Sequence, residues 1–220
     1  MSALYDITPF TLLDFPDHPA AIFWFAGCNL RCQYCYNPHI VYGNASIDEE
    51  DALNFLKKRK GLLEGVVLSG GEATLYSNLL EFCKKIRLLG FHIKLDTNGM
   101  KPDILKSLLD ANLLDYVAID YKATDFKFQT ISGHRNYKSF YQSLSLLNNS
   151  AVPFEIRTTY NPDLLTIDDI ALMKQNLDSL DYKGKYYIQL YKYTSTIGGL
   201  SAPIQPFETE KLQQFGILRI

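Results

Sequence analysis

Three cysteines, Cys28, Cys32 and Cys35, lie close together with the spacing C-x3-C-x2-C. Three thiolates at this separation can hold three irons of a cubane iron–sulfur cluster, whose irons normally take four Cys ligands. The fourth cysteine of the chain, Cys83, lies far along the sequence. A cluster held by the three would therefore keep one iron open to a further ligand, and an open iron is a place for chemistry as well as for electron storage.

A structural zinc ion is the alternative for the same loop. Sites of three cysteines and one histidine are common, and His39 follows the cysteines closely. The loop by itself leaves zinc and an open-iron cluster both open.

Disulfide pairing of these cysteines is disfavoured by the rest of the sequence. The N-terminus has no basic region followed by an apolar core, which a secretory signal peptide would show. The chain is also not dense in cysteine, as small secreted scaffolds are. We therefore expect a cytoplasmic protein whose thiols stay reduced.

The composition limits the partners of the protein. The 220 residues carry a formal net charge of −2, so no global field draws the chain to nucleic acid or to anionic membranes. No apolar run is long enough to cross a bilayer. We expect neither a nucleic-acid nor a membrane partner.

Apolar runs alternate with amphipathic segments along the chain, which indicates an α/β protein with a parallel sheet and right-handed crossovers. Six such units favour a partial (β/α)6 barrel of the TIM type over a complete eight-stranded one. The expected strands are 20–25, 65–68, 91–95, 116–119, 154–159 and 186–191. The expected helices are 48–58, 79–89, one that starts at Pro102, 137–147, 166–180 and a short closing helix at 207–215.

The length fits one domain. We expect that domain to cover residues 1–220, with a core over about 18–193. Residues 1–17 then form an N-terminal lead-in before the first strand, and 194–220 a C-terminal closing segment.

Polar motifs follow the predicted strands at the points where these end. The cysteine loop follows the first strand, Ser-Gly-Gly-Glu at 69–72 the second, and Asp-Thr-Asn-Gly at 96–99 the third. Asp120 closes the fourth strand, and Arg157 lies on the fifth. Because chemistry in barrel folds gathers at the C-terminal ends of the strands, these motifs should converge on one mouth. A structural zinc knuckle does not predict such a convergence.

The cysteine motif, Gly-Gly-Glu at 70–72 and Asp-Thr-Asn-Gly at 96–99 together resemble the radical S-adenosylmethionine (SAM) superfamily. More narrowly, they resemble the activating enzymes of glycyl radical enzymes. The opening Ile-Thr-Pro-Phe-Thr-Leu-Leu-Asp-Phe-Pro at 7–16 is similar to that of anaerobic ribonucleotide reductase activating proteins. The resemblance extends from residue 7 to residue 193.

The resemblance implies that Cys28, Cys32 and Cys35 ligate a 4Fe–4S cluster whose fourth iron binds the amino and carboxylate groups of SAM. Gly70, Gly71 and Glu72 would receive the amino group, and glycine suits this role because it lets the backbone approach closely. On its own, the glycine pair is equally typical of a tight turn after a strand. The implied SAM-binding residues are Tyr34, Asn37, Gly70, Gly71, Glu72, Asp96, Thr97, Asn98 and Arg157.

A monovalent cation site is also implied by one subgroup of activating enzymes. Its matching positions here are Asp96, Thr97, the carbonyl of Ala118 and Asp120, and oxygen ligands suit a hard cation. The alternative is that Asp120 is satisfied by loop amides and that Asp96 belongs only to a turn.

Two basic side chains have open roles. Arg157 is placed to grip the SAM carboxylate bidentately, or else to form a salt bridge with Glu155 or Asp120. Lys122 could face the mouth of the barrel or be solvated. Cys83 lies on the apolar face of a predicted helix and is expected to be a small buried hydrophobe.

The implied reaction is reductive cleavage of SAM to methionine and a 5′-deoxyadenosyl radical under anaerobic conditions. In activating enzymes this radical abstracts hydrogen from a backbone glycine of a partner glycyl radical enzyme. A reduced flavodoxin or a ferredoxin-type protein would supply the electron. The alternatives are a radical SAM enzyme for a small molecule or peptide, and a non-catalytic metal-binding interaction protein. Metal content discriminates the last, since one zinc per chain would support it and about four irons would exclude it.

Overall fold

The computed structural model describes residues 2–219, which form one nine-stranded sheet. Met1 and Ile220, the ends of the predicted single domain, lie outside the described residues. The strands are β1 (Ser2–Thr11), β2 (Ala20–Phe25), β3 (Ile47–Asp48), β4 (Gly65–Gly70), β5 (His92–Thr97), β6 (Tyr116–Asp120), β7 (Phe154–Tyr160), β8 (Lys185–Leu190) and β9 (Ile217–Arg219). Their order across the sheet is β3-β1-β2-β4-β5-β6-β7-β8-β9.

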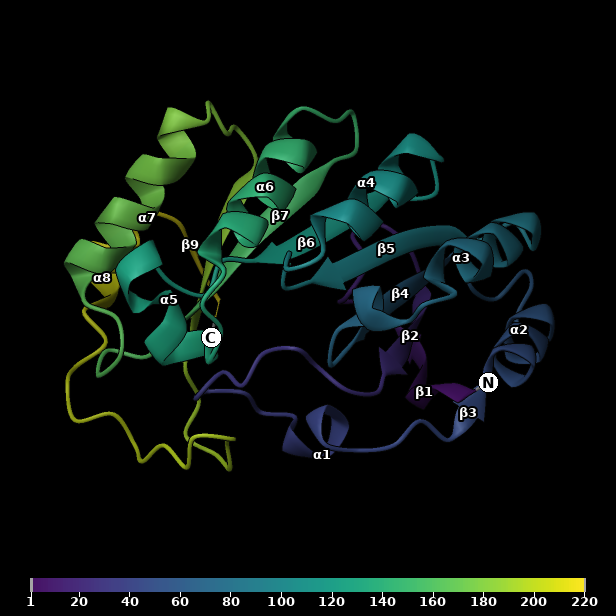
Figure 1. Cartoon of the computed structure of the whole chain (residues 1–220), viewed down its shortest axis with the longest axis horizontal. Coiled ribbons are helices and arrows are strands. Elements are labelled where there is room, and N and C mark those ends of the chain that lie inside the picture. Colours follow the sequence, from purple (N-terminus) through teal and green to yellow (C-terminus); the bar gives the residue numbers. More distant parts are fainter. Residues whose placement is uncertain (1, 220) are drawn as a thin grey trace.

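Neighbouring strands from β2 to β9 are all parallel, whereas β1 is antiparallel to both β2 and β3. The two edge strands are β3 and β9, so the curved sheet stays open (Figure 1). This confirms the predicted partial barrel, and β2, β4, β5, β6, β7 and β8 are the six predicted strands.

Most helices lie along one side of the curved sheet, whereas the short helix after β2 lies apart from them (Figure 1). The helices are α1 (Pro38–Val41), α2 (Glu49–Lys57), α3 (Leu79–Leu88), α4 (Pro102–Asp110), α5 (Asp125–Ser132), α6 (Tyr137–Asn148), α7 (Ile167–Ser179) and α8 (Thr209–Leu212). Their ends follow local chemistry. The Asp48 carboxylate accepts the N–H of Asp51 at 2.9 Å and caps α2. Thr166 and Asp169 form a capping box at the start of α7.

Three strands and two α-helices were absent from the prediction. Residues predicted as a lead-in form β1, which has no continuous apolar run because Asp6 and Pro9 interrupt it. Its pairing with β2 shifts register between Thr8 and Thr11, which places Pro9 at an irregularity where a missing N–H is tolerated. Strands β3 and β9 and helices α1 and α5 are the other additions, and the closing helix expected at 207–215 is confined to α8.

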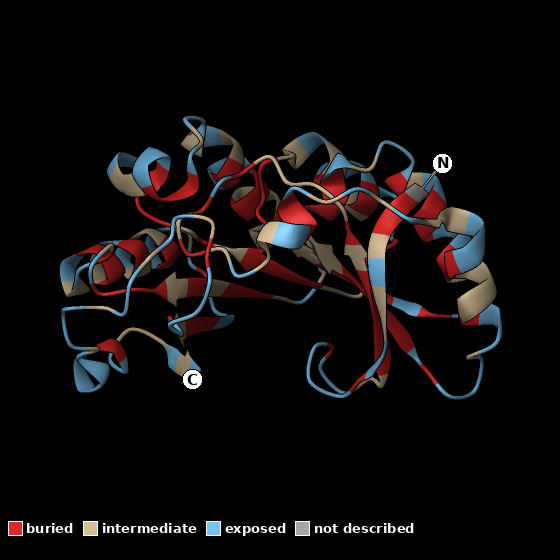
Figure 2. Ribbon diagram, turned by 90° about the horizontal axis from the view of Figure 1, so that it is seen from below, coloured by how far each residue is buried: buried red, intermediate tan, exposed pale blue. Residues whose placement is uncertain are grey.

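The main core lies between the sheet and the helices. Buried residues line the strands and the helix sides that face them (Figure 2). Phe82 on α3 is fully buried, with its ring centroid 6.1 Å from that of Phe23 and 6.4 Å from that of Phe25. Cys83 is also fully buried, which confirms the prediction for this thiol.

The opposite, inner face of the sheet carries a second and smaller apolar cluster. Its buried members are Phe15, Ala20, Ile22 and Val67, with Trp24 and Tyr116 packed against them. Further along β4 and β6, the same face carries Ser69 and Asp120. The apolar cluster therefore closes one end of the inner face and leaves the C-terminal strand ends for polar groups.

We expect Phe82→Ala to lower the free energy of unfolding by about 3–5 kcal/mol, because it removes a buried ring from the helix–sheet interface. Leu88→Ala on the same helix is the matched control, since Leu88 is 85% exposed and should change stability by less than about 0.5 kcal/mol. Urea unfolding of both variants measures the difference. Equal losses in the two would contradict the packing described.

Candidate active site

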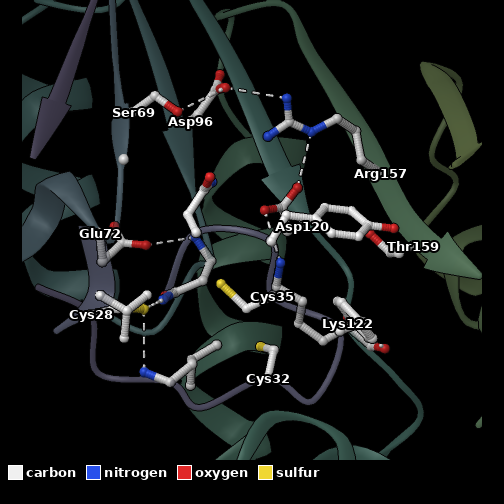
Figure 3. Close-up of a pocket in the computed structure, with 18 of the residues that line it drawn as sticks. Cys28, Cys32, Cys35, Ser69, Glu72, Asp96, Asp120, Lys122, Arg157 and Thr159 are labelled. Carbon is white, nitrogen blue, oxygen red and sulfur yellow. Dashed lines mark hydrogen bonds and ion pairs between the residues drawn. The ribbon is translucent and has the colours of Figure 1, made fainter. Parts of the chain in front are cut away.

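The three clustered cysteines lie on an irregular loop between β2 and α1, at the C-terminal end of β2. Cys32 is buried, and Cys28 and Cys35 are partly exposed. Figure 3 shows their sulfur atoms directed toward a common space above the sheet ends. The structure thus brings together the three predicted cluster ligands.

Backbone hydrogen bonds hold this loop from two sides. The N–H groups of Arg31 and Gln33 donate to the carbonyls of Ser132 and Ile131, at the C-terminal end of α5. The Cys35 carbonyl accepts the N–H of Ile197, at 3.1 Å. A loop without regular structure is therefore fixed by α5 and by the segment after β8, neither of which the sequence pattern had marked.

The Gly70–Gly71 pair lies directly under the cysteine loop. Gly70 has φ +115°, a conformation that side chains rarely adopt. A Cβ at Gly71 would lie 1.8 Å from the carbonyl oxygen of Gly27. The N–H of Glu72 donates to the same oxygen at 2.9 Å. The glycines therefore permit a backbone contact between the end of β4 and the start of the cysteine loop.

Glu72 is buried, and both of its oxygens have protein donors. Oε1 accepts from the Thr74 N–H and hydroxyl and from the Thr97 hydroxyl, at 3.1, 2.6 and 2.8 Å. Oε2 accepts the N–H of Asn98 at 2.8 Å. Burial raises the pKa of this carboxyl, and the donors oppose that rise. In this structure Glu72 joins the ends of β4 and β5, and its contact with SAM stays a prediction.

Asn98 connects the end of β5 to the cysteine loop. Its side-chain N–H₂ donates to Asn29 Oδ1 at 2.8 Å and lies 3.8 Å from Cys28 Sγ. Cys28 Sγ also accepts the N–H of Leu30 at 3.3 Å. Donors aimed at a sulfur are the surroundings that a metal-bound thiolate needs.

Burial sets the protonation of two of the thiols. It raises the pKa of Cys28 to about 12, against the opposing Leu30 N–H, and that of Cys32 to about 11. Both thiols are therefore protonated at neutral pH in the metal-free chain. Metal binding has to displace those protons, as is usual for thiolate ligands.

Charged side chains from three neighbouring strands form one network, which Figure 3 draws above the cysteines. Arg157 on β7 donates from Nε to Asp120 Oδ1 at 2.9 Å and from Nη1 to Asp96 Oδ2 at 3.2 Å. Lys122 Nζ pairs with Asp120 Oδ2 at 3.0 Å, and Lys94 pairs with Asp96 Oδ1. The salt bridge expected as one of two roles for Arg157 is thus formed with Asp120, but not with Glu155.

The network keeps its carboxylates ionised. Burial opposes ionisation of Asp120, but the Arg157 and Lys122 cations outweigh it and lower the pKa of this carboxyl to about 2. Burial likewise opposes ionisation of Asp96, and Arg157 and Lys94 lower its pKa. With three basic and two acidic side chains, the network carries one positive charge in excess. It is suited to an anionic group such as a carboxylate.

A cavity of about 420 Å³ lies between the cysteine loop and this network. Most of the predicted site residues line it, and Ala118 does not. The lining includes Cys28, Cys32, Cys35, Tyr34, Asn37, Gly70, Gly71, Glu72, Asp96, Thr97, Asn98, Asp120 and Arg157.

Several lining residues were not predicted. Lys122 was expected either to face the mouth of the barrel or to be solvated, and it faces the cavity. The Ser69 hydroxyl donates to Asp96 Oδ2 at 3.4 Å. Gln189 lies on β8, Lys192 follows β8, and Arg219 lies on β9. The sequence signal there was weak because no motif surrounds these three residues. Ser69 could have been found, since it directly precedes the glycine pair.

His39, the fourth ligand of the alternative zinc site, lies away from this cavity. Its ring lies 5.7 Å from the ring of Tyr5, and it is absent from the cavity lining. Within residues 2–219, no three His, Cys, Asp or Glu side chains are placed to share a single metal ion. The three thiols fit a larger cubane cluster, in which each thiolate binds its own iron.

Three thiols held over a cavity at the C-terminal strand ends of a partial barrel suit an iron–sulfur cluster with space for a ligand beside it. The family model of the Radical SAM superfamily matches residues 22–179. The chain belongs to this superfamily, and it is a radical SAM enzyme, of a family that uses a 4Fe–4S cluster and SAM.

Individual relatives agree with this assignment. MJ1227 of Methanocaldococcus jannaschii, named as a glycyl-radical enzyme activating enzyme, is 28% identical over 193 residues, 84% of this chain and 78% of that protein. The pyruvate formate-lyase-activating enzyme of Clostridium pasteurianum is 30% identical over 172 residues, 74% and 71% of the two chains.

The fold also matches a solved structure. SuiB of Streptococcus suis bound to S-adenosylmethionine superposes with a TM-score of 0.70 at 14% identity, over 88% of this chain and 45% of that one. This likeness concerns the fold.

Among the described residues, no helix is long and apolar enough to cross a membrane.

We expect Cys32→Ala to abolish both cluster assembly and SAM cleavage, because it removes one of three iron ligands. Cys83→Ala is the matched control, since Cys83 is a buried thiol on α3 outside the cavity. Iron content and 5′-deoxyadenosine formation after anaerobic reconstitution measure the effect. SAM cleavage by Cys32→Ala would contradict the ligand assignment.

We expect Glu72→Gln to lower the free energy of unfolding by about 1–3 kcal/mol, because a buried N–H would lose its acceptor. The side-chain amide of this variant would have one N–H₂ in place of an oxygen. This N–H₂ would face either the Asn98 N–H or the donors of Thr74 and Thr97, and a donor that faces another donor forms no hydrogen bond. Glu81→Gln on the exposed side of α3 is the control, with an expected change within about 0.5 kcal/mol. Urea unfolding without SAM is the measurement, and an unaltered Glu72→Gln stability would remove the bridging role of Glu72.

Proposed function

We propose that the chain is the activating enzyme of a glycyl radical enzyme, of the kind that serves anaerobic ribonucleotide reductase. The observation that carries this proposal is the similarity to two activating enzymes over most of both chains. The superfamily model, which matches residues 22–179, extends through the region that holds the cysteine loop and the charged network. The partner would be a large protein that presents a backbone glycine.

The chain's own residues have separable roles in this proposal. Cys28, Cys32 and Cys35 hold the cluster, and the glycine pair at 70–71 keeps the loop against the end of β4. The charged network, with its excess positive charge, orients the carboxylate of SAM. When bound and reduced, the cluster supplies the electron that cleaves SAM to methionine and a 5′-deoxyadenosyl radical.

Access to the cavity is consistent with a protein substrate. Lys192, just after β8, lines the cavity, and its N–H donates to the Tyr36 hydroxyl at 2.7 Å. The ring of Tyr36 stacks on that of Tyr191 at a centroid distance of 5.8 Å. This side of the cavity would meet the glycine loop of the partner. A reduced flavodoxin or ferredoxin-type protein would supply the electron, in the cytoplasm, where thiols stay reduced.

We expect the reconstituted enzyme, with SAM and a reductant, to generate a glycyl radical on its partner. Candidate partners of the ribonucleotide reductase and formate-lyase types, labelled with α-deuterated glycine, are the probes. The expected results are a glycyl radical signal in electron paramagnetic resonance and transfer of deuterium into 5′-deoxyadenosine. Both signals depend on hydrogen abstraction from the glycine, so they report the proposed step directly.

Two controls make the experiment decisive. Cys32→Ala should give neither signal, and a partner whose radical glycine is replaced by alanine should give no deuterium transfer. SAM cleavage without deuterium transfer from any of these partners would reject the activase and favour a small-molecule or peptide substrate. Absence of iron and of SAM cleavage would instead favour the non-catalytic alternative.

A further inference from the structure

Lys94 is the member of the charged network that has no contact with the cavity. It lies in the middle of β5, and its side chain is only 2% exposed. In the sheet register it is flanked by Val67 on β4 and Tyr116 on β6. Both of these belong to the apolar cluster at the closed end of the inner face or pack against it. A lysine this deep is rare without a partner.

The partner of Lys94 is Asp96, two residues further along the same strand face. Asp96 lines the cavity and Lys94 does not. The ammonium group therefore lies behind the cavity wall, on the side of Asp96 away from the ligand space. From there it can act on SAM only through Asp96, as a positioning residue.

The oxygens of the predicted cation site face basic side chains of the chain itself. Asp96 has Lys94 on Oδ1 and Arg157 on Oδ2. Asp120 has Arg157 on Oδ1 and Lys122 on Oδ2. Each of the four carboxylate oxygens thus has a protein cation as its partner.

The other two predicted cation ligands are also placed elsewhere. The Thr97 hydroxyl donates to Glu72, on the strand face opposite Asp96. Ala118 is fully buried and does not line the cavity. The donor set implied for a monovalent cation therefore does not fit the arrangement of these side chains.

We propose that Lys94 is a built-in cation that fixes Asp96 beneath the SAM cavity, so that SAM binding needs no dissolved monovalent cation. The ammonium neutralises one oxygen of Asp96, and the other oxygen orients the Arg157 guanidinium. A tethered charge of this kind loses no translational freedom when the site forms, unlike an ion taken from solution. The proposal rests on the superfamily assignment alone, and it stands or falls independently of the activase proposal.

The first test uses the reconstituted wild-type enzyme. SAM affinity is measured by equilibrium dialysis in potassium, sodium and tetramethylammonium chloride at one ionic strength of about 0.1 M. We expect the three dissociation constants to agree within about twofold. Binding that is about tenfold weaker in tetramethylammonium, a cation too large for an oxygen cage, would overturn the proposal.

Two variants of Lys94 separate its charge from its volume. Lys94→Met keeps most of the side-chain volume without the charge, and SAM should bind about tenfold more weakly in all three salts. Lys94→Ala leaves room for an ion. Its affinity should be equally low in tetramethylammonium and recover at least about threefold in potassium or sodium.

The controls decide between a charge effect and a packing effect. Lys106→Met makes the same exchange at a 57% exposed ion pair on α4 and should bind SAM as the wild type does. Iron content is measured for each variant, so that cluster loss is not mistaken for weak binding. Wild-type affinity in Lys94→Met, or no recovery of Lys94→Ala in potassium or sodium, would show that Lys94 is not the cation. If both variants fail to fold, the wild-type salt comparison still decides.

Discussion

The close backbone approach of Gly71 to Gly27 is the constraint on which the rest of the site depends. An added Cβ at Gly71 would lie 1.8 Å from the Gly27 carbonyl oxygen, so the two segments cannot keep this distance with any side chain there. The contact joins the end of β4 to the start of the cysteine loop. The loop has no regular structure of its own. Its contact with the end of β4 therefore fixes where the thiols lie relative to the sheet.

Electrostatics then organises the space beside the loop. Asp96 and Asp120 come from neighbouring strands, and Arg157 spans both. Isolated carboxylates buried so close together would repel one another and take up protons. Interleaved basic groups keep them ionised and fix their directions. The cavity thereby has a preorganised wall, which reduces the reorganisation that binding an anion would otherwise require.

Much of this arrangement could be predicted from the sequence because its signals are local. Continuous apolar runs mark strands covered on both faces, and Asp48 and Thr166 mark helix starts through their capping side chains. Motifs that follow parallel strands must meet at one edge of the sheet, which is why the cysteine loop, the glycine pair and Asp96 were expected together. The sequence therefore contained the fold class and the centre of the site.

The parts that could not be predicted depend on contacts between distant segments. The sequence does not predict the burial of Lys94. Its partner Asp96 makes that burial tolerable, and this pairing is known only once the strand faces are known. Helix α5 has weak amphipathic periodicity, so its sequence does not mark it as a helix. Its importance to the site comes from the carbonyls at its end, which accept the N–H groups of Arg31 and Gln33. The single-domain division and the direct SAM contacts remain predictions, because nothing in the described residues tests them.

The support that Ile197 and Gly198 give to the cysteine loop has a consequence for biosynthesis. Their N–H groups bond to the carbonyls of Cys35 and Gln33, which lie far earlier in the chain. A growing polypeptide exposes the cysteines long before it exposes these two donors, because synthesis proceeds from the N-terminus. The loop therefore gains these two bonds only after residues 197 and 198 have left the ribosome, and delivery of iron to the finished loop has to follow their synthesis.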